Sequence, residues 1–472
     1  MRTEHDSLGE MSLPDECVFG IHTARAVANF PMTGVTLSHF SELPVALAMI
    51  KKAAALANQD VGALAPQLAQ TIVAVCDQII GGQHHKHFVV DMVQGGAGTS
   101  TNMNANEVIA NLGLMRMGHR RGDYAHLHPN DHVNCSQSTN DVYPTAARLA
   151  LLLAVRPMLA AQRKLSAAFA ERGTAFSSIT KVARTQLMDA VPITLGMEFA
   201  AFAVTIEEDI ERLEHVSELL AETNLGGTAV GTGINAPPGY RRAAVDHLSA
   251  IFGSELVPAR DLVEASSDLG AFVTFSGVLK RVAVKLSKIC NDLRLLGSGP
   301  RAGLGEIILP AVQAGSSIMP GKINPVIPEV VNQAAYQVIG NDLTVTMAAE
   351  AGQLQLNAME PIVVFNILQS IRILTAAMTV LTERCVIGIV ADENRIAALL
   401  GNSLVAATAL VPVIGYERAA QVAKEALASG HSVEHTAIAL GYVTPEQFHA
   451  AMQVQPLLDQ AAKADASRKE PG

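Results

Sequence analysis

Three short polar segments of this 472-residue chain carry more hydroxyl and amide side chains than ordinary turns require. The first, GGAGTSTNMNANEV, begins at Gly95 and includes Thr99, and its glycines allow backbone N–H groups to approach an anion closely. It lacks the Gly-Lys-Ser/Thr ending of a P-loop. The segment therefore indicates a site for an anion and disfavours a nucleotide.

The second segment, HPNDHVNCSQSTND, runs from His128 to Asp141 and places Ser138, Thr139 and Asn140 immediately before an expected long helix. Residues of these types are ordinary helix caps as well as ligand-binding groups. One cap residue would be enough for capping. Both interpretations, capping and ligand binding, stay open for this segment taken alone.

The third segment, GSSIMPGKINPVIPE, runs from Gly315 to Glu329 and brings Ser316, Ser317, Lys322 and Asn324 into one loop. Prolines stiffen this loop and glycines supply hinges, so it could close over a ligand. The alternative is a solvated connection with a surface lysine.

This third segment resembles the GSSxMPxKxNP signature of the aspartase/fumarase superfamily, with every fixed position matched (Gly315, Ser316, Ser317, Met319, Pro320, Lys322, Asn324 and Pro325). The resemblance continues through the other two segments, through ARTQLMDAVPITLG around Thr185 and through GGTAVGTGIN from Gly226. It covers nearly the whole chain. It implies a mainly all-α fold, a three-domain lyase whose central long helices assemble into a tetrameric helix bundle.

Within the superfamily, the runs QSTND, RTQLMDAVP, ICNDLRLLGSGPRAGL and TMAAEAGQLQLNAMEP are most similar to the branch that removes ammonia from L-aspartate to give fumarate. The fumarate-hydrating branch usually has serine, histidine and glutamate where this chain has Thr139, Gln186 and Gln355. Three residues depart from the expected pattern. Gly321 is the residue that fumarate-hydrating members prefer where many ammonia-removing members have alanine, and Met197 replaces a glutamine common to both branches. Gln186 differs from the histidine found in other ammonia-removing members.

Two alternatives remain open at this point. One is another reaction of the same superfamily, either fumarate hydration or the addition of a larger amine to fumarate. The other is a catalytically silent structural oligomer, which would be expected to have lost Ser316 or Lys322, and both are present.

The resemblance also implies roles for individual residues. Ser316 would be the general base that takes the C3 proton and leaves a dianionic aci-carboxylate. An unassisted serine is a poor base, so Lys322 and backbone N–H groups must favour its alkoxide. Well-placed donors around the aci-carboxylate each contribute about 3 to 4 kcal/mol to lowering the barrier. The substrate-binding set is Thr99, Ser138, Thr139 and Ser317 for the carboxylate that gains charge, Lys322 and Asn324 for the other carboxylate with help from Thr185 and Gln186, and Asn140 for the leaving amino group.

No organic cofactor and no metal are expected. Glu329, after Pro328, is interpreted as a first-turn helix charge rather than a catalytic acid. His84, His85 and His87 are crowded without a carboxylate, which is typical of a polar loop.

Helical periodicity dominates the middle of the chain. Leu279, Val282, Leu286, Ile289, Leu293 and Leu296 recur at alternating three- and four-residue spacing, the seam of a bundle helix that ends at GSGP. Further helices are predicted over 143–172, 194–222 and 361–390. The predicted domains are 1–142, a central long-helix domain 143–395 and a small C-terminal helical domain 396–472.

Composition limits the partners. Charged residues make up 17% and hydrophobic residues 49%, which indicates that much of the monomer surface is given to other subunits. The net charge of −10, with scattered acidic residues, argues against nucleic-acid binding.

The most apolar stretches, 149–161 and 404–415, fall short of the ~20 residues of a membrane span. Five separated cysteines without a CxxC pair, and no apolar leader, indicate a cytoplasmic protein.

Helix length also bears on assembly. A helix over 143–172 is about 45 Å long at ~1.5 Å per residue, so Asn140 and Thr185 are expected near opposite ends of the bundle. We therefore predict a homotetramer in which different subunits share each site for the small dicarboxylate substrate.

Overall fold

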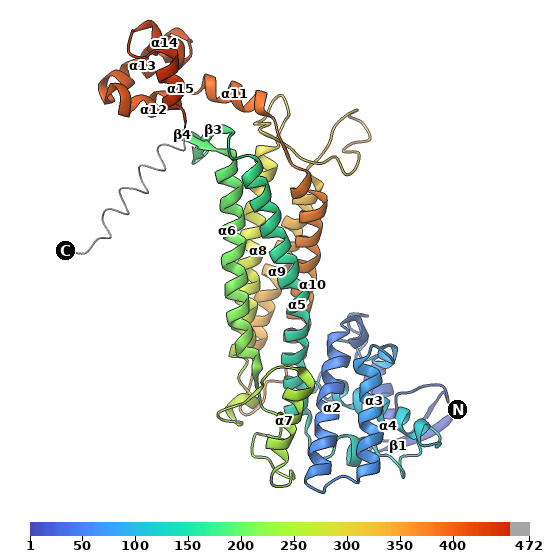
Figure 1. Cartoon of the computed structure of the whole chain (residues 1–472). Helices are drawn as coiled ribbons and strands as arrows, with labels where there is room; N and C mark the ends of the chain where they lie inside the picture. Colours follow the sequence, from blue (N-terminus) through green and yellow to red (C-terminus); the bar gives the residue numbers. More distant parts are fainter. Residues whose placement is uncertain (454–472) are drawn as a thin grey trace, which may run out of the picture. The chain divides into compact units, whose positions relative to one another are not determined.

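The computed structural model describes residues 1–453 and is mainly helical, as the sequence predicts (Figure 1). The chain forms two compact units. The first comprises residues 1–160, 209–284 and 334–375, and the second comprises 161–208, 285–333 and the described part of 376–472. The three-domain division stays a prediction.

Five long helices each contribute residues to both units: α5 (Thr139–Ala175), α6 (Leu195–Ser217), α8 (Gly270–Leu296), α9 (Val326–Glu350) and α10 (Glu360–Arg384). The predicted seam of α8 is confirmed, since all six of its residues are at most 5% exposed. α5 continues without interruption through Pro144 and Pro157. The predicted helix over 194–222 is shorter, because α6 ends at Ser217 and tightens into a 3₁₀ turn over Glu218–Ala221. α10 likewise ends at Arg384 rather than at residue 390.

The first unit contains the shorter helices α1 (Ile21–Asn29), α2 (Glu42–Asp60), α3 (Pro66–Ile80), α4 (Thr99–Arg116) and α7 (Tyr240–Phe252). α2 packs against α3, α4 and α7. The strands β1 (Arg2–Asp6) and β2 (Gly9–Leu13) form an antiparallel hairpin, and β5 (Glu222–Thr223) pairs in parallel with β6 (Val257–Pro258). A single π-helical turn, Pro129–Val133, precedes α5.

The second unit contains the antiparallel hairpin of β3 (Thr180–Thr185) and β4 (Met188–Thr194), and the short pair β7 (Ile307–Ile308) and β8 (Val390–Ala391). Five helices follow: α11 (Glu393–Asn402), α12 (Val405–Ile414), α13 (Tyr416–Ser429), α14 (Val433–Ala439) and α15 (Pro445–Ala451). Leu410, Val422, Ala437 and Phe448 belong to a separate small core formed by α12 to α15. Residues 454–472 of the predicted C-terminal domain lie outside the described residues.

Two helices correct the expectation about apolar stretches. α5 and the segment Glu360–Gly388 are long and apolar enough to cross a membrane by length and composition alone. The expectation failed because it considered only the most apolar short runs. In the folded chain 67% and 56% of the two windows are buried, so packing within the protein accounts for much of their apolar character.

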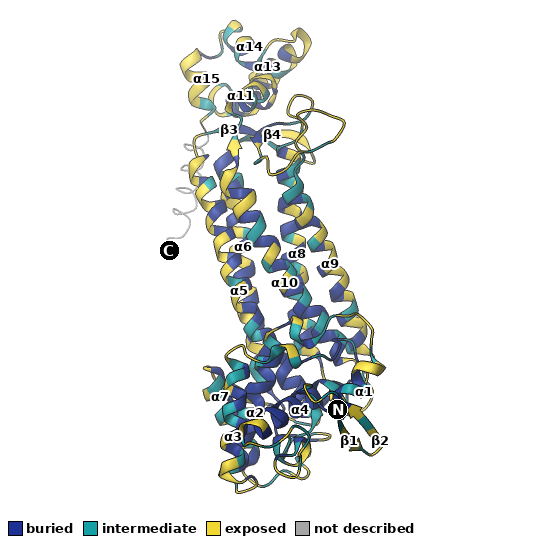
Figure 2. Cartoon of the chain, turned by 90° about the vertical axis from the view of Figure 1, so that its right-hand side faces the viewer, coloured by how far each residue is buried: buried dark blue, intermediate teal, exposed yellow. Residues whose placement is uncertain are grey.

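Burial also distinguishes the faces of α9. Tyr336, Ile339, Leu343 and Met347 follow one another at helical spacing and are 58%, 36%, 62% and 65% exposed. Figure 2 shows buried and exposed residues alternating along this helix. The described chain therefore leaves an apolar stripe on α9 facing outward.

Candidate active site

The predicted site residues divide between the two units. Thr99, Ser138, Thr139 and Asn140 belong to the first unit, whereas Thr185, Gln186, Ser316, Ser317, Lys322 and Asn324 belong to the second.

In the first unit, the beginnings of α4 and α5 meet. Asn102, in the first turn of α4, donates a hydrogen bond of 3.1 Å from Nδ2 to the Thr139 hydroxyl at the start of α5. Gly98 (φ +85°) precedes α4, and a Cβ there would lie 2.3 Å from the ring of Tyr143 in α5. The glycine-rich segment is thus required for close packing, and the positive ends of two helix dipoles come together where an anion would be favoured.

The hydroxyls of this group differ in how their protons are used. Thr139 Oγ1 accepts from Asn102, and Ser138 Oγ accepts from the Asn140 backbone N–H at 3.3 Å, so both hydroxyl protons remain available to a carboxylate. Thr99 Oγ1 instead donates to the Gly96 carbonyl at 2.8 Å and must exchange that bond to bind a substrate.

Asn140 is held by the polar loop that follows β5. Its Nδ2 donates to the Ala229 carbonyl at 2.6 Å, and its own carbonyl accepts from Asn224 at 2.9 Å. This bond uses the side-chain nitrogen of Asn140 only. The side-chain oxygen, Oδ1, can therefore accept a hydrogen bond from an ammonium group. Ser138, which immediately precedes α5, accepts the Asn140 backbone N–H as a helix cap does and keeps its own hydroxyl proton, so capping and ligand binding are compatible here.

A buried lysine lies beneath this group. Lys51 in α2 is 0% exposed, and its Nζ donates to Asn102 Oδ1, Asn134 Oδ1 and Gln137 Oε1 at 2.7, 2.8 and 3.0 Å. Burial lowers the pKa of Lys51 to about 7. Three acceptors match the three donors of an ammonium group. Lys51 thereby orients Asn102, which in turn contacts Thr139.

Asp141 ties the start of α5 to the Gly226 loop. Its carboxylate accepts from the backbone N–H groups of Ser138, Gly226 and Thr228 at 2.9, 2.8 and 3.3 Å. Burial raises the pKa of Asp141 to about 6. Asp141 serves as a scaffold for the neighbouring residues Ser138 and Asn140.

In the second unit, Thr185 and Gln186 lie at the tip of the β3–β4 hairpin. Thr185 ends β3 opposite Met188, and the two-residue turn places Gln186 and Leu187 at φ 56° and 65°. Positive φ at both positions is the feature of a type I′ hairpin turn. Both predicted residues are exposed at this tip.

The Ser316 loop is closed on itself. Gly315 N–H donates to the Lys322 carbonyl at 2.9 Å, and Asn324 Nδ2 donates to the Gly315 carbonyl at 2.7 Å. A Cβ on Gly315 would lie 2.3 Å from the Lys322 carbonyl, so only glycine fits. Asn324 therefore holds the loop closed with one of its two amide protons.

Ser316 Oγ accepts two backbone hydrogen bonds, from Ile318 N–H at 3.1 Å and Met319 N–H at 3.0 Å. These donors favour the alkoxide over the neutral hydroxyl. Among the described residues, Lys322 Nζ has no hydrogen bond or ion pair with the chain, which leaves it available to a carboxylate. Glu329 is in the first turn of α9, where the sequence predicted a helix charge.

A buried ion network connects the two segments of this second group. Glu306 is 0% exposed and contacts Arg184 Nη1 at 2.7 Å and Lys181 Nζ at 2.6 Å, both on β3. Lys181 also pairs with Glu198 at 2.6 Å. Glu306 precedes β7 on the way to the Ser316 loop, so the network fixes the hairpin to the segment that leads to that loop.

Sequence reasoning did not single out Lys51 or Glu306. The signal for Lys51 was a lysine pair inside the otherwise apolar run PVALAMIKKAAALA. A charged residue in such a run is buried only when it is paired or hydrogen-bonded. Glu306 had no comparable local signal.

The long-helix fold and the hydroxyl-rich segments define a lyase of the aspartase/fumarase type, and comparison with known families agrees. The lyase family model matches residues 9–340, and the model described as the fumarase C C-terminus matches residues 407–459. The chain belongs to this lyase family, and the superfamily resemblance is confirmed.

Among its relatives, "Aspartate ammonia-lyase" of Pseudomonas fluorescens is 59% identical over 92% of this chain and 91% of the relative. The protein of the same name from Escherichia coli (strain K12) is 48% identical over 98% and 97%. A solved "fumarate lyase:delta crystallin from Brucella melitensis bound to cobalt" has a TM-score of 0.93 and 60% identity, covering 96% of this chain and 98% of that chain. The class II fumarase of Schistosoma mansoni has a TM-score of 0.89 and 32% identity over 96% and 98%.

Proposed function

We propose that this protein catalyses the reversible elimination of ammonia from L-aspartate to give fumarate, a carbon–nitrogen lyase reaction. The observation that carries the proposal is identity of 48% to 59% over at least nine tenths of the chain to relatives named aspartate ammonia-lyase. Thr139 and Gln186 distinguish the chain from the pattern usual in fumarate-hydrating members.

The chemistry of the first group supports binding of the carboxylate that gains charge. Ser138 and Thr139 hold unused hydroxyl protons at the meeting point of two helix N-termini. As the C3 proton leaves, negative charge grows on this carboxylate, and preorganised donors stabilise it without reorganising at that moment. Asn140 accepts a hydrogen bond from the amino group that leaves as ammonia.

The chemistry of the second group supports Ser316 as the base. Its oxygen already receives two backbone N–H bonds, so the alkoxide that abstracts the C3 proton is stabilised before the substrate arrives. Ser317 joins the donors to the aci-carboxylate. Lys322 and Asn324, assisted by Thr185 and Gln186, hold the other carboxylate. No organic cofactor takes part.

The test is product formation. The purified protein, with no organic cofactor added, should form fumarate and ammonia from L-aspartate far faster than it forms fumarate from L-malate. Preference for malate would instead support fumarate hydration, and inactivity toward both would support a silent structural relative.

We further propose a homotetramer in which different subunits contribute to each site. The exposed apolar stripe of Tyr336, Ile339, Leu343 and Met347 on α9 suits packing against a second copy of the chain. α5 has 37 residues, about 55 Å at ~1.5 Å per residue. Its two ends cannot both contact one small dicarboxylate. Asn140 lies at one end and Thr185 follows the other, which supports a site to which neighbouring subunits contribute.

Subunit mixing tests this arrangement. Inactive Ser316→Ala and inactive Asn140→Ala subunits, unfolded and refolded together, should regain part of the wild-type activity, because some sites receive both intact segments. Each variant refolded alone is the control. Mixed oligomers that form but stay as inactive as either parent would contradict shared sites.

We also propose that the protein acts in the reducing cytoplasm. Its five cysteines, which all lie within the described chain, are free thiols. Identical activity and thermal stability with and without a thiol reductant are expected, and a loss of stability on reduction would contradict this location.

A further inference from the structure

A cluster of metal-ligating side chains lies outside the candidate active-site residues, in the connection that follows α4. His119, Asp123 and His126 each offer a ligand atom, and these atoms all lie within 4.8 Å of one another. One carboxylate oxygen, Asp123 Oδ2, is 3.8 Å from both His119 Nδ1 and His126 Nε2. The two imidazole rings stack with centroids 3.7 Å apart.

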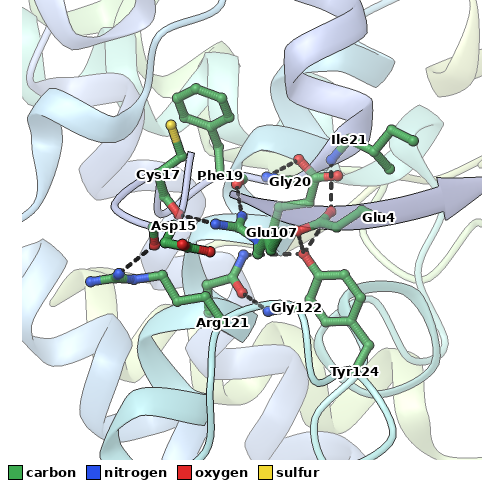
Figure 3. Close-up of polar contacts among 12 residues, drawn as sticks. Glu4, Asp15, Cys17, Phe19, Gly20, Ile21, Glu107, Arg121, Gly122 and Tyr124 are labelled. Atoms are coloured by element: carbon green, nitrogen blue, oxygen red, sulfur yellow. Dashed lines mark hydrogen bonds and ion pairs between the residues drawn. The ribbon is translucent and has the colours of Figure 1, made fainter. Parts of the chain in front are cut away.

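The loop that carries this cluster is held by buried polar contacts, several of which Figure 3 shows. Tyr124, between Asp123 and His126, donates to the buried carboxylate of Glu4 at 3.2 Å. Gly122 N–H donates to Asn111 at 2.8 Å, and Asn111 donates to the Tyr124 hydroxyl at 3.1 Å. The backbone between the ligands is thus fixed before any metal binds.

Residues of the N-terminal segment make further hydrogen bonds that hold this loop. Arg121 donates to the Asp15 carbonyl at 2.6 Å. Glu4, the partner of Tyr124, also pairs with Arg2 at 2.7 Å and accepts from the backbone of Ile21 at 2.9 Å (Figure 3). A preorganised loop gives up little conformational freedom when its side chains converge on an ion.

The ligand set selects the class of metal. Two imidazole nitrogens and one carboxylate oxygen suit first-row transition ions such as Co²⁺, Ni²⁺ and Zn²⁺, whereas Mg²⁺ and Ca²⁺ prefer oxygen ligands. Bonds of about 2.1 Å in a tetrahedral site place ligand atoms about 3.4 Å apart. The 3.8 Å nitrogen–oxygen separations are close to this spacing, and the stacked rings must rotate apart so that the ion lies in the plane of each imidazole.

The surroundings leave room for the remaining ligands. The side chains of His119, Asp123 and His126 are 31%, 45% and 48% exposed, so water can complete the coordination. The other crowded histidines offer less: His84 Nε2 contacts Gln78 Oε1 at 3.0 Å, and His85 Nε2 contacts the Ile79 carbonyl at 2.8 Å.

We propose that His119, Asp123 and His126 form a binding site for a divalent first-row transition metal. The ion binds His119 Nδ1, His126 Nε2 and Asp123 Oδ2 once the two rings have rotated out of their stack, and it links the two ends of the loop. The residues proposed to bind aspartate are not among its ligands. The outcome of the metal-binding test is therefore independent of the outcome of the activity test.

Cobalt titration tests the site. Co²⁺ added to the metal-free full-length protein near pH 7.5 should produce visible d–d absorption that saturates with one tight equivalent per chain. Zn²⁺ should abolish this absorption, and Mg²⁺ in large excess should not. The double variant His119→Ala/His126→Ala should lose this equivalent, and Asp123→Asn should bind it at least about 10-fold more weakly, since one of three ligands is removed.

A matched control removes a histidine that has a carboxylate neighbour but no second histidine. His215 lies 3.7 Å from Glu218 with both side chains at least 77% exposed, and His215→Ala should bind cobalt as the wild type does. Circular dichroism of each variant checks that it is folded. Wild-type cobalt binding by a folded His119→Ala/His126→Ala protein would overturn the proposal, and so would the absence of a tight equivalent in the wild type.

Discussion

Replacing Lys51 by methionine should separate the positioning of the active site from the stability of the fold. Methionine keeps a flexible apolar stem of similar length but donates no hydrogen bond. Asn102 Oδ1 then loses its 2.7 Å bond to Lys51, and Asn102 no longer fixes the Thr139 hydroxyl. Because small displacements of a binding group cost about 10² in rate, we expect kcat/KM for L-aspartate to fall by about that factor.

The stability change should be small, because two effects oppose each other. Burial lowers the pKa of Lys51 from 10.5 to about 7; at about 1.4 kcal/mol per unit, this costs about 4 kcal/mol at a pH near 7.5, and the cost disappears in the variant. Against this, the mainly neutral amine present at this pH donates to two of the amide oxygens, and each lost donor costs about 1 to 3 kcal/mol. With a central cost of about 4 kcal/mol for the two amides, the two effects cancel to within about 2 kcal/mol.

The pH dependence gives an independent check. The folded pKa of Lys51, about 7, lies below the unfolded value of 10.5, so the stability linked to this group is present above pH 10.5 and is lost as the pH falls to 7. Between a pH of about 7.5 and 9.5, the free energy of unfolding of the wild type should rise relative to that of Lys51→Met by about 1.4 kcal/mol per pH unit. Below a pH of about 6.5 the difference should be constant.

Steady-state fumarate formation and denaturant unfolding at several pH values measure both effects. Lys52→Met is the matched control: the adjacent lysine pairs with Asp77 at 2.6 Å near the surface and should change neither kcat/KM nor the pH slope. A folded Lys51→Met enzyme with wild-type kcat/KM would refute the positioning role. A flat pH difference between 7.5 and 9.5 would refute the depressed pKa.

Three further predictions concern other residues. Ser316→Ala should keep the helical circular dichroism and the oligomer but lose about 10² to 10⁴ in kcat; near-normal turnover would place the base elsewhere. Gly98→Ala should lower the midpoint of thermal unfolding and the activity together, since its Cβ would lie 2.3 Å from Tyr143 at φ +85°, and an unchanged midpoint would contradict the tight packing. Burial raises the pKa of Glu360 from 4.5 to about 8, so wild-type stability linked to this group is present below pH 4.5 and lost as the pH rises through 8. As the pH rises from about 5 to 7.5, the free energy of unfolding of Glu360→Gln, measured with denaturant, should therefore increase relative to that of the wild type by about 1.4 kcal/mol per pH unit. No relative increase would contradict the raised pKa.

The parts of the fold that sequence could predict are those governed by local periodicity. The three- and four-residue spacing of Leu279, Val282 and Leu286 predicts a packed helix wherever it occurs, and α8 forms it. The β3–β4 hairpin was not foreseen. Its turn uses Gln186 and Leu187 at positive φ, where Asn-Gly or Asp-Gly would have been the recognisable signal.

The active-site residues with hydroxyl or amide groups were predictable for a different reason. Ser316, Ser138 and Thr139 stand in polar segments that interrupt apolar helices, and such an interruption needs an explanation. How their protons are used was not predictable, because it depends on backbone geometry. The two N–H groups that face Ser316 Oγ come from a loop conformation that no residue type fixes on its own.

Lys51 shows why the supporting residues of a site are harder to find than those that contact substrate. Helical periodicity separates inside from outside only when one face of a helix is exposed. In α2, thirteen of nineteen residues are buried, so its pattern cannot distinguish Lys51 from Lys52. The difference is made by partners from distant segments: Asn102, Asn134 and Gln137 surround one lysine, and Asp77 meets the other. The free energy of burying a charge is therefore decided by tertiary contacts, and a lysine that is costly to bury persists where its hydrogen bonds hold reactive groups in place.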